Sequence, residues 1–133
     1  MNKAQALQAF WASFGIPAFD ENTVPDTKDI PDRFITYSVA TGSMESVVNL
    51  TASIWELNTH SWQFVEETAE TIARVLEERD FTHMGINAPT IPLDEGRLYL
   101  TQGQPFSQRM ADPGSELTRR IYLNVQAEFL TAY

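Results

Sequence analysis

The chain has 133 residues, a length that suits one domain with its own hydrophobic core, and 43% of these residues are hydrophobic. It contains no cysteine, which excludes disulfides and thiol chemistry. Its formal net charge of −9 argues against a nonspecific nucleic-acid binder, because such proteins need a basic surface to displace counterions from phosphates.

The sequence also bears on where the protein acts. Its first residues show no secretory signal, and no stretch approaches the roughly 20 apolar residues that a membrane span needs. We therefore expect a cytoplasmic product with no membrane partner. The acidic charge has two interpretations: it keeps the protein soluble, or it forms a surface along which DNA passes without being held.

A first amphipathic helix is predicted near the N-terminus. Apolar side chains recur there at helical spacing: Ala4, Leu7, Phe10, Trp11 and Phe14. Gly15 follows where a left-handed cap would end the helix, and Pro17 prevents its continuation. We interpret the aromatic residues as core anchors. The polar stretch 20–32 contains two prolines and predicts an irregular, solvated loop.

The next two segments predict an antiparallel hairpin. Residues 34–39 and 47–57 are rich in β-branched and aromatic side chains and alternate between apolar and polar positions. With Ile35 opposite Ala52 and Tyr37 opposite Leu50, the apolar faces of the two strands agree. The expected connection is a turn near Gly42.

A second amphipathic helix is predicted over residues 61–79, with one apolar stripe and glutamates on the other side. Glu66 and Glu70 share a face, so they are formally candidates for a carboxylate pair in acid–base chemistry. A solvated helix face explains them better, because no partner group is positioned by the sequence. Residues 84–94 predict a loop or a short edge segment.

The longest alternating pattern covers residues 117–130 and predicts a half-buried strand well beyond the usual length. The sequence at 112–115 fits a type II turn, which pairs this strand with residues 97–110. The predicted register places these residues opposite each other: Leu98 and Phe129, Leu100 and Ala127, Phe106 and Ile121, Met110 and Leu117. Gly103 and Pro105 predict a bulge or bend in the shorter arm. We expect the tip, around residues 108–119, to leave the globular body.

Motifs of common chemistry are missing from the sequence. It has no phosphate-binding glycine loop, no dinucleotide fingerprint, no nucleophile elbow and no cluster of metal ligands. His60 and His83 are its only histidines and lie far apart. We therefore predict that the protein is not an enzyme and has no catalytic residue, cofactor or metal site.

Several local phrases resemble a known family. They are Gly-Ile-Pro-Ala at 15–18, the run at 31–37, the acidic second helix and the ending Arg-Arg-Ile-Tyr-Leu-Asn-Val at 119–125. Together they resemble the tail terminator (tail completion) and minor tail proteins of long-tailed bacteriophages. The resemblance implies an α+β fold, with a mainly antiparallel sheet flanked by helices, and a hexameric ring. Such a ring caps the tail tube and joins the tail to the head; the family has no catalytic residues.

Together, residues and resemblance predict one α+β domain over residues 1–133. We expect a mainly antiparallel sheet of four to five strands, two amphipathic helices on one face and a long C-terminal hairpin. The hypothesis for the subunit contact names five residues of that hairpin: Phe106, Met110, Leu117, Arg119 and Arg120. The same apolar residues could instead fold back onto the protein's own helices.

The expected function is that of a structural virion protein, assembled in the host cytoplasm and located in the tail. Its partners would be further copies of itself, the tail tube protein and head–tail connector proteins, with DNA only passing through an acidic lumen. Three alternatives remain at this point: a neck or head–tail connector protein of similar fold, a small ligand- or peptide-binding module, and an enzyme of undetected type.

Overall fold

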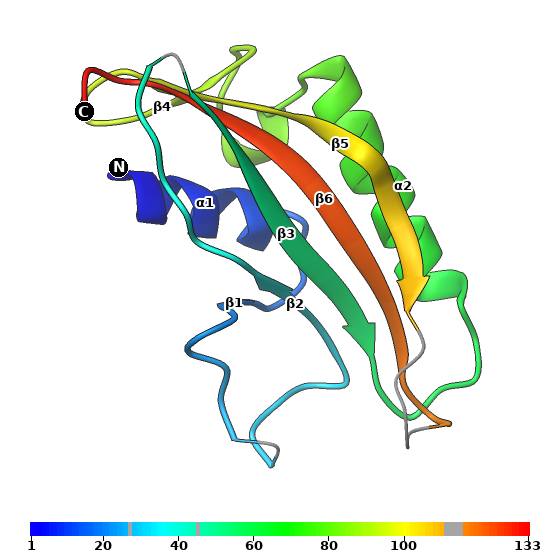
Figure 1. The fold of residues 1–133 in the computed structure, drawn as a ribbon. Coiled ribbons are helices and arrows are strands. Elements are labelled where there is room, and N and C mark those ends of the chain that lie inside the picture. The colour runs from blue at the N-terminus through cyan, green and yellow to red at the C-terminus, as the bar shows by residue number, and fades with distance from the viewer. Residues whose placement is uncertain (27, 45, 111–115) are drawn as a thin grey trace.

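The computed structural model describes residues 1–26, 28–44, 46–110 and 116–133 (Figure 1). Its elements are α1 (Lys3–Ala12), β1 (Ala18–Asp20), β2 (Arg33–Tyr37), β3 (Val47–Glu56), α2 (Gln63–Glu78), the 3-10 turn η1 (Thr82–Met84), β4 (Ile91–Pro92), β5 (Arg97–Met110) and β6 (Arg119–Leu130). The six strands form one sheet in the order β1-β2-β3-β6-β5-β4. Among the described strands, only β1 and β2 pair in parallel. The predicted α+β class is confirmed, with more strands than expected.

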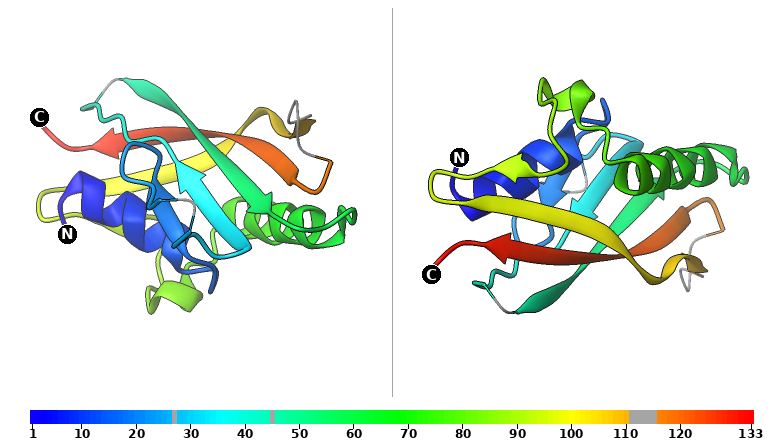
Figure 2. Two further views of the ribbon diagram at one scale, coloured as in Figure 1. Left: turned by 90° about the horizontal axis from the view of Figure 1, so that it is seen from below. Right: turned by 90° about the horizontal axis from the view of Figure 1, so that it is seen from above.

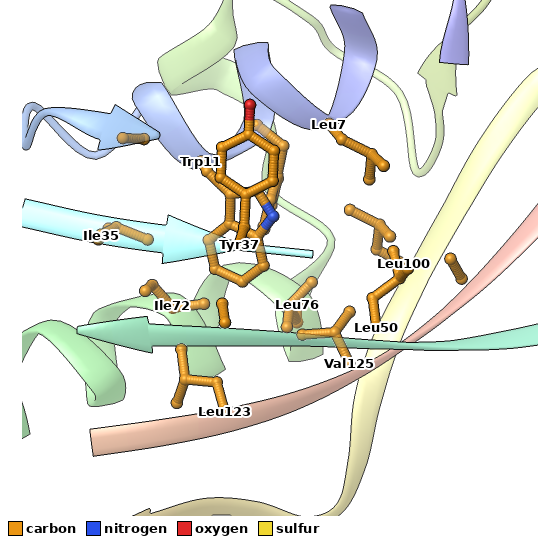
Figure 3. Close-up of a cluster of buried hydrophobic side chains, with 14 of the residues drawn as sticks. Leu7, Trp11, Ile35, Tyr37, Leu50, Ile72, Leu76, Leu100, Leu123 and Val125 are labelled. Atoms are coloured by element: carbon orange, nitrogen blue, oxygen red, sulfur yellow. The ribbon is translucent and has the colours of Figure 1, made fainter. Parts of the chain in front are cut away.

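Both helices lie on the same side of the sheet, as two views of the molecule show (Figure 2). Buried side chains of both helices join those of the strands in one cluster (Figure 3). Its labelled members include Leu7 and Trp11 of α1, Ile72 and Leu76 of α2, and Leu50 and Val125 of the sheet. Because side chains alternate along a strand, every second residue of β3 and β6 enters this core.

The first helix forms where the sequence predicts it and ends slightly earlier. Asn2 and Gln5 form a capping box that satisfies amides at its start. The helix ends at Ala12, while Gly15 takes the expected left-handed conformation with φ +76° in the turn that follows. Phe10 and Trp11 are fully buried, which confirms their role as core anchors.

The loop predicted over residues 20–32 begins inside a strand that the sequence did not indicate. The three residues of β1 pair in parallel with β2, and the Ile35 amide donates to the Pro17 carbonyl at 2.8 Å. A strand this short carries no readable alternation, which is why it was missed. The predicted short edge segment within 84–94 is confirmed as β4, which pairs with the start of β5.

The predicted β2–β3 hairpin is correct in its direction and wrong in its register. Ile35 lies opposite Ile54 rather than Ala52, and Tyr37 lies opposite Ala52 rather than Leu50. A shift of two residues keeps each side chain on its face, so the apolar pattern is equally satisfied. The observed register brings Phe34 opposite Trp55, and their rings stack with centroids 5.8 Å apart.

The β5–β6 hairpin follows the predicted register only in its first half. Leu98 lies opposite Phe129 and Leu100 opposite Ala127, as predicted. Beyond Gln102 a bulge adds three more residues to β5 than to β6, so that Arg109, not Phe106, lies opposite Ile121. Met110 likewise lies opposite Arg120 and not opposite Leu117. The bulge occurs where Gly103 and Pro105 predict it, but the predicted register had made no allowance for its extra residues.

The described residues on both sides of the hairpin tip remain attached to the sheet. Met110 pairs with Arg120, which in turn pairs with Trp55 of β3. The Leu117 carbonyl accepts a hydrogen bond from the Thr59 amide at 3.0 Å. The expectation that the tip leaves the body over residues 108–119 is therefore wrong for these residues. The predicted turn at 112–115 lies outside the described residues.

Candidate interaction surface

The five side chains predicted for the subunit contact do not share one face. Phe106 packs against the core beside α2, and the Arg119 guanidinium lies over the ring of Trp62, the residue before α2. Met110 and Arg120 lie opposite each other on the other side of the sheet. Leu117 lies in the turn before β6 and is 45% exposed. The predicted contact is therefore divided between two surfaces.

The first surface, on the face that carries no helix, is a row of stacked side chains that crosses three strands. We call Phe34, Trp55 and Arg120 the aromatic row; Phe34 is buried, whereas Trp55 and Arg120 are half-buried and reach the surface. Phe34 and Trp55 stack with an interplanar angle of 8°, and the Arg120 guanidinium lies 4.5 Å from the Trp55 ring centroid. Arg120 Nε also donates to Ser53 Oγ at 3.0 Å. Arg120 is thus fixed by its own sheet, and Met110 continues the row on β5.

The second surface is a groove between α2 and the part of β5 beyond the bulge. We call it the α2–β5 groove, and its volume is about 740 Å³. Small side chains of α2 and apolar side chains of the sheet form part of its lining. The full lining is Gln63, Glu66, Glu67, Ala69, Glu70, Ala73, Phe106, Ser107, Gln108, Arg109 and Ile121.

The α2–β5 groove is acidic along its helix wall. Three glutamates face a single arginine, so its lining carries two net negative charges at neutral pH. Arg109 Nε donates to Glu66 Oε1 at 2.6 Å, and its guanidinium lies 4.6 Å from the Trp62 ring centroid. Glu67 and Glu70 stay exposed to solvent. The groove therefore retains carboxylates that its own arginine does not neutralise.

Beside the groove, β5 is the edge of the sheet. In the part of the chain that the structure describes, β4 pairs with β5 only at Arg97 and Leu98. The rest of β5 pairs with β6 on one side, and none of the described strands pairs with it on the other. The Gln102 side chain donates to the Ala73 carbonyl at 2.9 Å, which holds α2 next to this edge. An edge strand presents backbone amides and carbonyls to any extended chain that approaches it.

The sequence contained only part of the information needed to find this groove. The helical spacing of Glu66 and Glu70 places them on one face, which the sequence alone predicts to be solvated. Phe106 was identified as a contact residue but was placed in the wrong register. The groove exists because the bulge carries β5 past α2, and neither the helix pattern nor the strand pattern shows that encounter.

Titratable groups with a shifted pKa lie away from the groove. Burial, with the nearby Asp20 carboxylate, raises the pKa of Tyr37, whose hydroxyl donates to Gln8 Oε1. Hydrogen bonds from the hydroxyl and amide of Thr82 lower the pKa of Asp80. Both groups make structural hydrogen bonds, and neither lines the groove.

Within the described ranges, no helix is long and apolar enough to cross a membrane. Nor do the residues outside the gaps bring together three or more His, Cys, Asp or Glu side chains that could hold a metal ion. Neither the models of known protein families nor the curated proteins include a match to this chain.

Proposed function

We propose that the chain is a structural assembly protein of a long-tailed bacteriophage: a tail terminator that forms a ring, caps the tail tube and joins the tail to the head. The proposal starts from the resemblance of residues 15–18, 31–37 and 119–125 to that family. The α+β fold, with a mainly antiparallel sheet and two helices on one face, is compatible with it.

The observation that carries the proposal is the pair of different surfaces at one end of the β5–β6 hairpin. A closed ring of identical subunits joined head to tail requires two different surfaces on each subunit. The aromatic row, with Met110 beside it, occupies one face of the sheet. Phe106 and Arg119 lie on the other, beside α2 and the Trp62 ring that precedes it. Leu117 adds an exposed apolar side chain at the same end.

The charge of the chain supports the same function. A ring through which DNA passes must not hold its phosphates, and the net charge of −9 supplies repulsion instead of counterion release. In the proposed assembly the ring is a hexamer, and its further partners are the tail tube protein and a head–tail connector protein. The mature protein would then reside in the virion.

Oligomeric mass tests the ring directly. Native mass spectrometry over a range of protein concentrations should show one discrete large species, and Phe106→Asp/Met110→Asp should convert it to monomers. Because Phe106 packs against the core, Met110→Asp/Leu117→Asp provides a second variant at two positions outside the core cluster. Met44→Asp is the matched control, since Met44 is exposed at the other end of β6. A large species that persists in both double variants would refute the proposed contact.

A second experiment separates a terminator from a neck or connector protein. Addition of the protein to polymerising tail tube protein should stop elongation and leave capped tubes in electron micrographs. Tubes that elongate normally, together with an intact ring, would favour the connector alternative. The α2–β5 groove favours a further candidate, a peptide-binding module, in which case native mass spectrometry should show a monomer or dimer and no larger species at any concentration.

A further inference from the structure

We propose that the α2–β5 groove binds an extended, basic segment of another protein, which adds to the sheet as a strand along the free edge of β5. This partner site goes beyond the ring proposed above and does not depend on it. Of the five residues predicted for the ring contact, Phe106 alone lines the groove.

The backbone of β5 provides the first part of the site. Beyond Leu98, the described residues of β5 have no strand on the side away from β6. The groove follows this edge at Phe106, Ser107, Gln108 and Arg109. An extended peptide placed there can pair with the exposed amides and carbonyls, and such pairing gives affinity without regard to side chains.

The side chains of the groove select the segment. Ala69 and Ala73 have small side chains, which leave space beside α2, while Phe106 and Ile121 give the groove an apolar surface. Successive side chains of a bound strand point to opposite faces, so every second residue of the partner would enter the groove. Lysine and arginine suit these inward-pointing positions, because each has an apolar stem for the groove surface and a charged end for its carboxylates.

The charges that line the groove determine the charge of the partner segment. Arg109 is engaged by Glu66, whereas Glu67 and Glu70 point to solvent on the exposed face of α2. Lysine or arginine in the bound segment would neutralise these carboxylates and would be steered toward them at low salt. A phosphate or nucleic-acid ligand would be repelled by the same residues.

The charge also argues against a second copy of this chain as the occupant. The other edge of the sheet is β1, which is three residues long and ends with Asp20. Pairing this acidic edge with the acidic groove would place like charges together in a protein of net charge −9. A segment from a different, basic chain fits the groove better.

Fluorescence anisotropy with a short labelled peptide that alternates lysine with valine tests the proposal. The wild-type protein should bind it saturably with a stoichiometry of one, more weakly as salt rises. A peptide with glutamate in place of lysine should not bind. Hydrogen exchange should slow at β5 amides beyond the bulge when the lysine peptide binds, since strand addition occupies them. Absence of saturation up to about 1 mM peptide, or binding without protection in β5, would overturn the proposal.

Matched charge reversals on one helix locate the binding. Glu67→Lys/Glu70→Lys should weaken binding by roughly tenfold or more, because two attractions become repulsions. Glu77→Lys/Glu78→Lys changes the same net charge at exposed positions of α2 that do not line the groove, and should leave binding nearly unchanged. Equal weakening by both variants would mean nonspecific attraction and would refute the site.

If the peptide instead dissociates an oligomer that Glu67→Lys/Glu70→Lys also dissociates, a second copy occupies the groove and the proposal fails. The ring remains separately testable through Met110→Asp/Leu117→Asp.

Discussion

Arg33 Nε lies 2.5 Å from Glu56 Oε2 across the β2–β3 pair. The Glu56 side chain is 9% exposed, whereas that of Arg33 is 59% exposed and its guanidinium lies 4.3 Å from the Phe64 ring centroid. One partner of the ion pair is therefore buried and the other reaches solvent. The two halves of the pair are not equivalent, because only the carboxylate has lost its water.

Arg33→Ala should lower the free energy of unfolding by about 1–3 kcal/mol, since it leaves the buried Glu56 carboxylate without its charged partner. Urea denaturation followed by circular dichroism measures the change. Arg33→Ala/Glu56→Leu should recover part of the loss, because no buried charge remains. Arg74→Ala, at an exposed position of α2, is the control. A loss below about 0.5 kcal/mol in Arg33→Ala would contradict the prediction.

Gly96 should tolerate no side chain. It has φ +92°, and an added Cβ would lie 2.0 Å from the Leu130 carbonyl oxygen. Gly96→Ala therefore combines left-handed strain with a backbone clash and should cost about 2–5 kcal/mol. The midpoint of urea denaturation reports the loss.

Gly85 offers a matched control for the clash. It has φ +76°, but an added Cβ would meet no atom within 4 Å. Gly85→Ala should therefore cost only the conformational strain, about 1–2 kcal/mol. Equal costs at Gly85 and Gly96 would show that the contact with Leu130 is relieved by movement of the chain.

Alternation along the strands predicted the sheet faces well and its registers poorly, for a physical reason. Ile35 is buried whether it lies opposite Ala52 or Ile54, because a two-residue slip returns every side chain to the same face. What distinguishes the two registers is the stacking of Phe34 on Trp55 on the other face. Apolar pattern alone does not weigh such a pair.

The hairpin shows the same limit at its bulge. The pairs formed by Leu98 and Leu100 were predictable because both of their partners on β6 are apolar and no interruption intervenes. Gly103 marked the position of the bulge, but its size depends on how the chain packs against β6. The α2–β5 groove depends on that size. The sequence therefore predicted Phe106 as a contact residue but did not predict the groove.

Asp80 should make folding stability depend on pH in the acidic range. Hydrogen bonds from the Thr82 hydroxyl and amide lower the folded-state pKa of Asp80 below its ordinary value of 3.8. The stabilisation is therefore present above that value and is lost as the pH falls through the folded-state pKa. Thr82→Val removes the hydroxyl and should raise the pKa of Asp80 toward 3.8, as an NMR titration of its carboxyl carbon would show. A pKa unchanged by Thr82→Val would mean that the amide alone sets it; Thr71→Val, at an exposed position on α2, is the control.

Asn124 should hold the β5 bulge in place. Its Nδ2 donates to the Pro105 carbonyl at 2.9 Å. Its backbone also lies close to Gly103: a Cβ added at Gly103 would be 2.9 Å from the Asn124 carbonyl oxygen. Asn124→Ala should lower the free energy of unfolding by about 0.5–1.5 kcal/mol, the usual contribution of one hydrogen bond. Asn124→Asp has nearly the same shape, but its carboxylate accepts and cannot donate, so it should lose at least as much. Gln126→Ala, at an exposed position of the same strand, should change stability by less than about 0.5 kcal/mol. Urea denaturation ranks the three variants, and an Asn124→Asp protein as stable as the wild type would show that packing of Gly103 against β6, without the amide hydrogen bond, fixes the bulge.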